Sequence, residues 1–326
     1  MRDCDICGTP NFKENSYCTH CGNKLILEHV CPVCGETNSN LSTHCVNCGS
    51  QLNPIAIEDF ETLFSQFNLD LLENASITNE QYNQLLSRIF IRANYIDIRG
   101  ATTRDKILNF ASIFTICKPK ARGYERGYIF LGKNIYYDDR LDDSVQIATI
   151  IHELGHYLLF EIIESLLCSI FKVETSTTLQ SFVWYFLILP EFKVMNEYCA
   201  HTVEGRFIPY GYQNYGSFNV LVEEMGIDEE SIDSMIMLGN SFANEIIVYL
   251  EKYIDEDLRD EIKLQYRKDL TPPKYDSIYR ETDDSFLLDF KNSILLRMLF
   301  DVFKEVSDND EEIKELENIK EGIEFT

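Results

Sequence analysis

The stretch IHELGHYL, residues 151–158, lies near the middle of the 326-residue chain and puts three polar side chains into an apolar segment. Side chains four positions apart share one face of a helix, so His152 and His156 can direct their imidazoles at one point. Glu153 lies one position further along and can lean over the same point. We therefore predict a helix from about residue 144 to residue 159 or beyond, with a ligand site on one face.

Apolar residues surround these polar groups on most sides of the predicted helix, which should therefore be a buried central element. Polar groups buried in this way need partners. Gly155 carries no side chain, so a neighbouring element can approach the helix closely between the two histidines. The HExxH arrangement supplies two zinc ligands, His152 and His156, and a general base, Glu153, for metal-bound water. A third protein ligand has to come from elsewhere in the chain.

The third ligand is expected in residues 194–204, VMNEYCAHTVE. This segment follows Leu189-Pro190, where a helix through about residue 206 is predicted to begin. Glu197, His201 and Glu204 stand at positions i, i+4 and i+7 and therefore share one helical face. We favour Glu197 as the third ligand and keep His201 and Glu204 as alternatives.

The segments around the motif indicate a small sheet and further helices. Residues 128–131 and 134–137 are rich in aromatic and β-branched side chains and flank Gly132-Lys133, which predicts a hairpin. Residues 134–137 precede the motif helix directly, as an edge strand above a cleft would. The apolar stretch between His156 and Glu197 is either an additional core helix or a lid or wall of a substrate cleft. The acidic segment 308–324 has apolar residues at helical spacing and should form an amphipathic helix.

The motif and its downstream helix resemble the gluzincin metallopeptidases. Over about residues 128–210, the hairpin, HELGH and the Glu197…Ala200…Pro209 region are similar to the ImmA/IrrE-type peptidase domains of bacteria and phages. The resemblance implies that His152 and His156 are ligands, that Glu153 is the base and that Glu197 is the third ligand. Many gluzincins have an aspartate four residues after the ligand glutamate, and here that position is His201. His201 could bond a carboxylate, stabilise an oxyanion or replace Glu197 as ligand.

The N-terminal segment carries a second kind of motif. Eight of the 11 cysteines lie in the first 48 residues, as CxxCG, nine residues and CxxCG, a unit used twice with a 27-residue offset. Two CxxCG knuckles can complete a tetrahedral shell of four sulfurs, which suits zinc. Residues 4–49 resemble the double zinc ribbon family, and a disulfide scaffold is disfavoured without a signal peptide. The predicted ligands of two structural zinc ions are Cys4, Cys7, Cys18, Cys21, Cys31, Cys34, Cys45 and Cys48.

The charge balance excludes several classes of partner. The net charge is −25, and residues 1–53 are acidic as well, whereas nucleic acids and anionic membranes select basic surfaces. The ribbons are therefore expected to bind a protein. The first residues, MRDCDICG, contain no apolar core of a signal peptide, and the apolar stretches 147–171 and 179–192 do not have the composition of a membrane span. We expect a cytoplasmic protein without a membrane segment.

These observations predict an α+β protein in three parts. Residues 1–50 form a double zinc ribbon, residues 51–57 a linker, and residues 58–326 a mostly helical, zincin-like domain with a small antiparallel sheet. The expected function is zinc-dependent hydrolysis of peptide bonds in an intracellular protein, with one catalytic zinc and two structural zinc ions. The alternative is a non-cleaving adaptor or sensor that uses its ribbons for protein contacts. A nucleic-acid-binding regulator is a third reading, against which the acidic charge argues.

Overall fold

The computed structural model describes most of the chain after residue 57. The described residues are 57–66, 75–90, 100–120, 126–171, 173–209, 216–226, 229–266 and 291–325, together with 2–3, 10–11, 29–31, 35–38, 45–47, 52 and 72. Several predicted positions lie outside them: most of the linker 51–57, and Cys4, Cys7, Cys18, Cys21, Cys34 and Cys48.

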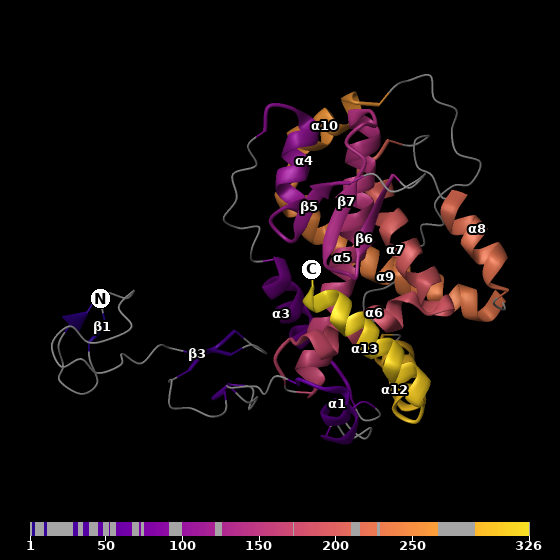
Figure 1. Ribbon diagram of the computed structural model, residues 1–326. Helices are drawn as coiled ribbons and strands as arrows, with labels where there is room; N and C mark the ends of the chain where they lie inside the picture. The colour runs from indigo at the N-terminus through magenta and orange to yellow at the C-terminus, as the bar shows by residue number, and fades with distance from the viewer. Residues whose placement is uncertain are drawn as a thin grey trace.

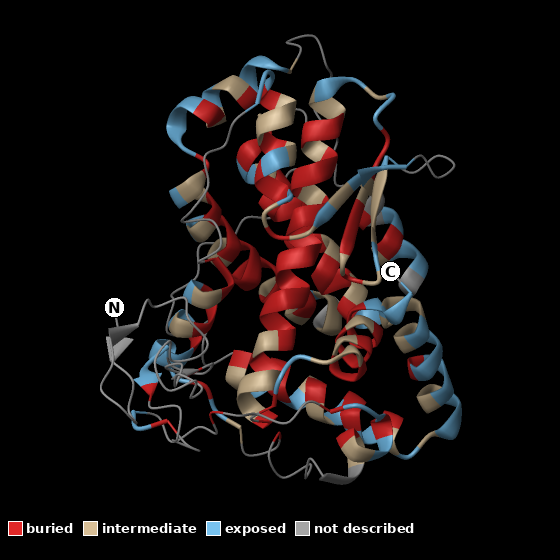
Figure 2. Ribbon diagram, turned by 60° about the vertical axis from the view of Figure 1, so that its left-hand side comes forward, coloured by how far each residue is buried: buried red, intermediate tan, exposed pale blue. Residues whose placement is uncertain are grey.

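A long apolar helix, α5 (Asp143–Phe171), is the centre of the fold. It continues well past residue 159 because apolar residues follow without a glycine or proline to end it. Among the described residues, α5 is the one helix long and apolar enough to cross a membrane by those criteria, yet 78% of its most apolar window is buried inside the fold. Figure 2 shows the buried residues concentrated on the central helices, while the peripheral helices expose their outer faces.

Two further helices stack beside α5. Helix α7 (Pro190–Phe207) begins with proline in its first turn, as predicted, and packs on α5. Gly155 makes this approach possible, because a Cβ there would lie 3.0 Å from the Cα of Ala200. Helix α9 (Glu229–Tyr253) packs against α7, where a Cβ on Gly239 would lie 2.7 Å from the carbonyl oxygen of Met195. The predicted role of Gly155 as a point of close approach is confirmed.

A three-stranded mixed sheet lies against α5 (Figure 1). Its strands β5 (Ile116–Pro119), β6 (Gly127–Phe130) and β7 (Asn134–Tyr137) are ordered β5-β7-β6. Strand β6 pairs antiparallel with β7, whereas β5 pairs parallel with it. The prediction of an antiparallel sheet was therefore wrong, as was the prediction that residues 134–137 form an edge strand. Strand β7 is central, and its mostly buried residues are typical of that position.

The predicted hairpin between β6 and β7 is confirmed. Leu131 and Gly132 both have a positive φ, of 50° and 68°, which a tight turn of this hand requires. The turn also packs on α5, because a Cβ on Gly132 would lie only 2.4 Å from the ring of Phe160. Glycine at this position therefore fixes the sheet close to the motif helix.

The remaining helices surround this core. Thr78 and Gln81 exchange hydrogen bonds of 3.0 and 3.3 Å at the start of α3 (Asn79–Phe90), which is the capping box that the sequence TNEQ favours. The acidic segment forms the predicted amphipathic helix, α13, which buries Leu316 and packs on α6. The other elements are α1 (Phe60–Gln66), α3 (Asn79–Phe90), α4 (Thr103–Ala111), α6 (Thr177–Ile188), α8 (Gly216–Met225), α10 (Glu256–Leu264), the π-helix η2 (Lys291–Leu295), α12 (Leu296–Ser307) and α13 (Asp310–Glu324).

Two short hairpins repeat in the N-terminal segment. Strands β1 (Arg2–Asp3) and β2 (Pro10–Asn11) pair antiparallel, and so do β3 (His29–Val30) and β4 (Thr37–Asn38). Arg2 faces Asn11 in the first ladder, and His29 faces Asn38 in the second. The backbone pairing therefore recurs with the same 27-residue period as the cysteine pattern.

Candidate metal centre

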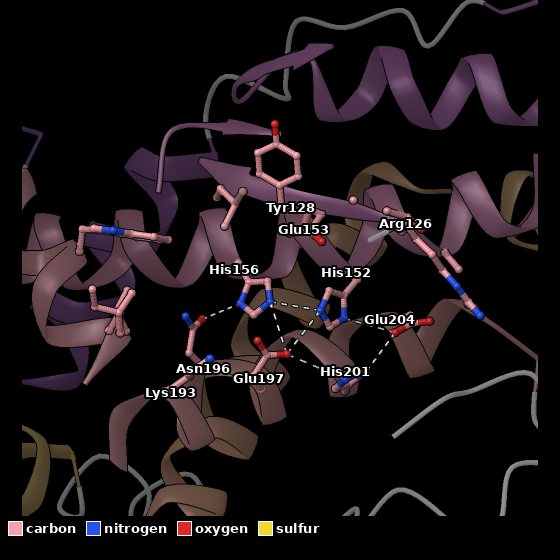
Figure 3. Close-up of a pocket in the computed structure, with 17 residues that line it drawn as sticks. Arg126, Tyr128, His152, Glu153, His156, Lys193, Asn196, Glu197, His201 and Glu204 are labelled. Carbon is pink, nitrogen blue, oxygen red and sulfur yellow. Dashed lines mark hydrogen bonds and ion pairs between the residues drawn. The ribbon is translucent and has the colours of Figure 1, made fainter. Parts of the chain in front are cut away.

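Helices α5 and α7 bring the predicted ligands together (Figure 3). The Nε2 atoms of His152 and His156 lie 3.1 Å apart. They lie 3.7 and 3.8 Å, respectively, from Oε2 of Glu197 on α7. Ligand atoms bound tetrahedrally at zinc bond lengths are about 3.3–3.4 Å apart. The three atoms are therefore spaced much like three corners of such a shell.

His201 contributes to the same cluster. His152, Glu197 and His201 form a group that could hold a metal ion, with ligand atoms within 4.8 Å of one another. The Nε2 of His201 lies 4.0 Å from the same Oε2 of Glu197. Two sets of three ligands can therefore be drawn. Both contain His152 and Glu197, and the third member is His156 in one set and His201 in the other. The set with His156 is the tighter one, since its pairwise distances run from 3.1 to 3.8 Å.

Glu204, the other predicted alternative, lies on the far side of the imidazoles. Its Oε2 is 3.3 Å from Nδ1 of His152 and 3.2 Å from Nδ1 of His201. The contact with His201 is a hydrogen bond, whereas the contact with His152 is an ion-pair distance without hydrogen-bond geometry. The Glu204 carboxylate is therefore placed to orient two imidazoles from behind rather than to share an ion with their Nε2 atoms.

Asn196 is a residue of the site that the sequence did not single out. Its Oδ1 accepts a hydrogen bond of 2.7 Å from Nδ1 of His156, which leaves the Nε2 of that ring facing Glu197. Asn196 stands four positions before Ala200, a residue at which α7 approaches α5 closely. It therefore lies on the face of α7 that meets the motif helix, and this spacing was a signal that could have identified it.

The carboxylates set the charge of the imidazoles. Burial lowers the pKa of His152, but the carboxylates of Glu204, Glu153 and Glu197 outweigh burial and raise it to about 9. Burial likewise lowers the pKa of His156, in this case to about 4. Burial raises the pKa of Glu204, yet the close contacts and charge of His152 and His201 hold it at about 2. Without an ion, a proton on His152 offsets part of the carboxylate charge, and a divalent cation would take over that task.

The cluster forms the floor of a cavity of about 710 Å³. The buried side chain of Glu153 lies in this cavity, above the two motif histidines and near Tyr128 in Figure 3. The cavity is lined by residues of β6, of the segment just before β6, and of α5, α6 and α7. The lining residues are Arg126, Gly127, Tyr128, Ile129, Ala148, Thr149, His152, Glu153, His156, Trp184, Leu187, Ile188, Lys193, Asn196, Glu197, His201 and Glu204.

Strand β6 borders the cavity along its edge. Successive residues of a strand point to opposite faces, so the four consecutive lining residues 126–129 can border one cavity only at the strand's edge. The other edge of β6 is paired with β7. Gly127 allows this placement, because a Cβ there would lie 2.3 Å from Cγ2 of Thr149 and 3.6 Å from Cγ of Glu153.

The remaining walls differ in character. Helix α6 supplies an apolar wall of Trp184, Leu187 and Ile188, although most of that helix is core. The apolar stretch between His156 and Glu197 therefore provides both core and cavity wall. Arg126 and Lys193 also line the cavity, and neither forms an ion pair with a carboxylate of the described residues.

Two of the eight predicted cysteine ligands are described, and they lie together. Cys31 and Cys45 are buried and form one cluster with Leu52. The side-chain amide of Asn38 donates to Sγ of Cys45 at 3.5 Å, and the backbone N–H of Asn47 donates to it at 3.4 Å. Gly35, the glycine after the CxxC pair, has the positive φ of 73° that its position predicts. N–H donors aimed at a sulfur favour its thiolate form, which is the form that binds metal.

Comparisons with protein-family models, with curated proteins and with solved structures find no match for this chain.

Proposed function

We propose that the protein is a zinc-dependent metallopeptidase that hydrolyses peptide bonds of an intracellular protein. The observation that carries the proposal is the convergence of His152, His156 and Glu197 beneath the buried carboxylate of Glu153, at the floor of a cavity. Two imidazoles, one carboxylate and an adjacent acidic side chain are the groups that a gluzincin site needs.

The donor set fits zinc by its chemistry and its spacing. Imidazole nitrogen and carboxylate oxygen are ordinary zinc ligands, and Asn196 and Glu204 hold imidazoles by their Nδ1 atoms, as the outer partners of metal-bound histidines do. A zinc ion held there supplies Lewis-acid chemistry, because it lowers the pKa of a water and polarises a carbonyl.

Glu153 acts as the proton carrier of the reaction. Its carboxylate takes a proton from the attacking water and later delivers it to the leaving amine. Burial beside β6 holds the carboxylate over the ligand cluster and away from bulk solvent. The position therefore favours a base that faces the substrate.

The edge of β6 is suited to an extended peptide. A peptide that adds to a free strand edge forms main-chain hydrogen bonds and places alternate side chains in flanking pockets. The apolar wall from α6 suits an apolar side chain, and Arg126 and Lys193 suit acidic ones. We therefore propose a substrate segment that binds in extended form and combines apolar with acidic residues.

The N-terminal cysteines are proposed to hold two structural zinc ions and to present a surface for a protein partner. The 27-residue repeat of the hairpins and the burial of Cys31 beside Cys45 support two similar modules. The acidic charge of the chain supports a protein and not a nucleic acid as the partner. A cytoplasmic location is part of the same proposal, because reducing conditions keep such cysteines available for metal.

Replacement of Glu153 by glutamine tests the peptidase. The full-length zinc-loaded protein is incubated with a mixed peptide library, and new termini are identified by mass spectrometry. We expect cleavage by the wild type and by Glu191→Gln, which changes an exposed carboxylate at the start of α7, but none by Glu153→Gln with its zinc retained. Equal cleavage by Glu153→Gln would contradict the assigned role of this residue.

The alternative of a non-cleaving adaptor is favoured by one observation. The Nε2 of His201 reaches the same carboxylate oxygen as the motif histidines, which brings the available protein donors to four, the number in closed structural zinc sites. An adaptor has no use for a buried acid at the position of Glu153. Absence of cleavage by the wild type and by every variant with an opened metal site would favour the adaptor.

A further inference from the structure

Two facing helices each offer a pair of donors at i, i+4 spacing. Helix α5 supplies His152 and His156, and helix α7 supplies Glu197 and His201. The two pairs face each other beside the close contact between Gly155 and Ala200. An i, i+4 pair directs both side chains to one side of its helix, so this arrangement gathers four donors and not three.

The imidazoles of His152, His156 and His201 share one pattern of contacts. Their Nε2 atoms lie 3.7, 3.8 and 4.0 Å from one oxygen, Oε2 of Glu197, for His152, His156 and His201 respectively. Their Nδ1 atoms face an acceptor on α7, which is Asn196 for His156 and Glu204 for the other two rings. Figure 3 shows these contacts as a continuous chain of dashed lines around Glu197.

The position of His201 beside His152 favours a role as a metal ligand and not as a donor to an oxyanion. Their ring centroids lie 4.4 Å apart, and the Nδ1 atoms of both rings contact the same oxygen, Oε2 of Glu204. A metal-bound histidine has its second nitrogen held by a carboxylate in this manner, which fixes the tautomer and aims the other nitrogen at the ion. Glu204 thus prepares His152 and His201 for the same task.

We propose that His201 is a fourth protein ligand of this metal centre, so that the resting ion is held by three imidazoles and the carboxylate of Glu197 and has no open position. The inference rests on the metal centre of the proposed function. The resting site is consequently closed, and hydrolysis requires a bound peptide to displace His201 from the ion. The 4.0 Å separation between Nε2 of His201 and Oε2 of Glu197 would have to shorten by roughly 0.6 Å to match a tetrahedral shell.

Cobalt at the central site gives a direct count of the ligands. The full-length protein is treated with a chelator until the central ion is removed, refilled with Co²⁺, and checked to contain cobalt once per two zinc ions. X-ray absorption at the cobalt edge then counts bound imidazoles without a contribution from the zinc sites. Acetohydroxamic acid, a small chelating probe, reports on an open position through a change in the visible spectrum of cobalt.

Two asparagine variants make the count specific. The side-chain amide of asparagine can replace the Nδ1 atom of histidine in its contact. Asparagine has no atom where the Nε2 atom of histidine lies. His201→Asn is the test, and His156→Asn is the matched control that removes one motif ligand. We expect three imidazoles and no response to acetohydroxamic acid in the wild type. We expect two imidazoles and a clear response in His201→Asn, with cobalt affinity lowered by roughly 10- to 100-fold.

The outcomes separate this inference from the proposed function. Two imidazoles and a hydroxamic acid response in the wild type would overturn the four-ligand shell while leaving the peptidase intact. Failure to hold any ion at the central site would overturn both. The wild-type measurements decide the question alone if His201→Asn does not fold.

Discussion

The close approach of α5 to α7 makes Gly155→Ala an informative change. The new Cβ would lie 3.0 Å from the Cα of Ala200 and 3.5 Å from the Cβ atoms of Ala200 and Val203. Carbon atoms in favourable contact are about 3.5–4.0 Å apart. The nearest atom belongs to the backbone and cannot rotate away, so the two helices have to separate by roughly 0.5–1 Å.

The energetic effect follows from packing and is isolated by a matched control. Overpacking of this kind costs about 1–3 kcal/mol. Alanine in a helix recovers about 0.5–1 kcal/mol relative to glycine. Gly322→Ala in α13 gains the same helix stability, and its nearest atom, Cδ1 of Leu131 at 2.8 Å, is the end of a flexible side chain. The difference in unfolding free energy between the two variants should therefore be about 1–3 kcal/mol.

Metal binding is the second readout of this change. A helix separation of roughly 0.5–1 Å exceeds the tolerance of about 0.2 Å on metal–ligand distances. Restoring the ligand positions on metal binding costs about 1–3 kcal/mol in this variant, so its metal affinity should be weaker by about 5- to 150-fold. Denaturant unfolding and competition with a chelating dye measure the two quantities. Equal stability and equal metal affinity in Gly155→Ala and Gly322→Ala would refute the reasoning.

Three other predictions test separate parts of the site. Asn196→Ala removes the acceptor for Nδ1 of His156 and should lower metal affinity by roughly 10- to 100-fold, measured by dye competition, with unchanged far-ultraviolet circular dichroism. Gly127→Ala places a Cβ 2.3 Å from Thr149 and should displace β6, so peptide cleavage should fall while metal content stays constant. Metal uptake at pH 7 should release about one proton per central ion, because the pKa of His152 is about 9 in the metal-free site. Calorimetry in two buffers of different ionisation enthalpy measures that release, and a buffer-independent heat would contradict it.

The local parts of the site could be predicted from the sequence. The helical spacing of His152 and His156 depends only on residues within about one turn, and so does that of Glu197 and His201, so each motif showed which side chains share a face. Gly155 identified a point of close approach because an absent side chain between two polar groups has a direct steric meaning. The capping box at Thr78 and the hairpin around Gly132 were predictable for the same local reason.

The parts that depend on tertiary packing could not be predicted in this way. Strand β5 pairs parallel with β7, and no pattern within either strand specifies that partner. The hairpin alone did not show which strand borders the cavity, because residues 134–137 were predicted as the edge strand, whereas β6 borders the cavity and β7 is central. Glu204 could be read as a ligand because its spacing from Glu197 is helical, and only the positions of the two rings place it behind them.

The central claim is that the motif helix holds a metal ion in addition to the two proposed in the ribbons. Metal content per chain, measured by elemental mass spectrometry after purification with zinc supplied, tests it most directly. The comparison is between the wild type and the double variant His152→Ala, His156→Ala. We predict about three zinc ions in the wild type and about two in the variant. About two ions in both proteins would contradict the account and leave the HELGH segment as a structural helix without a metal.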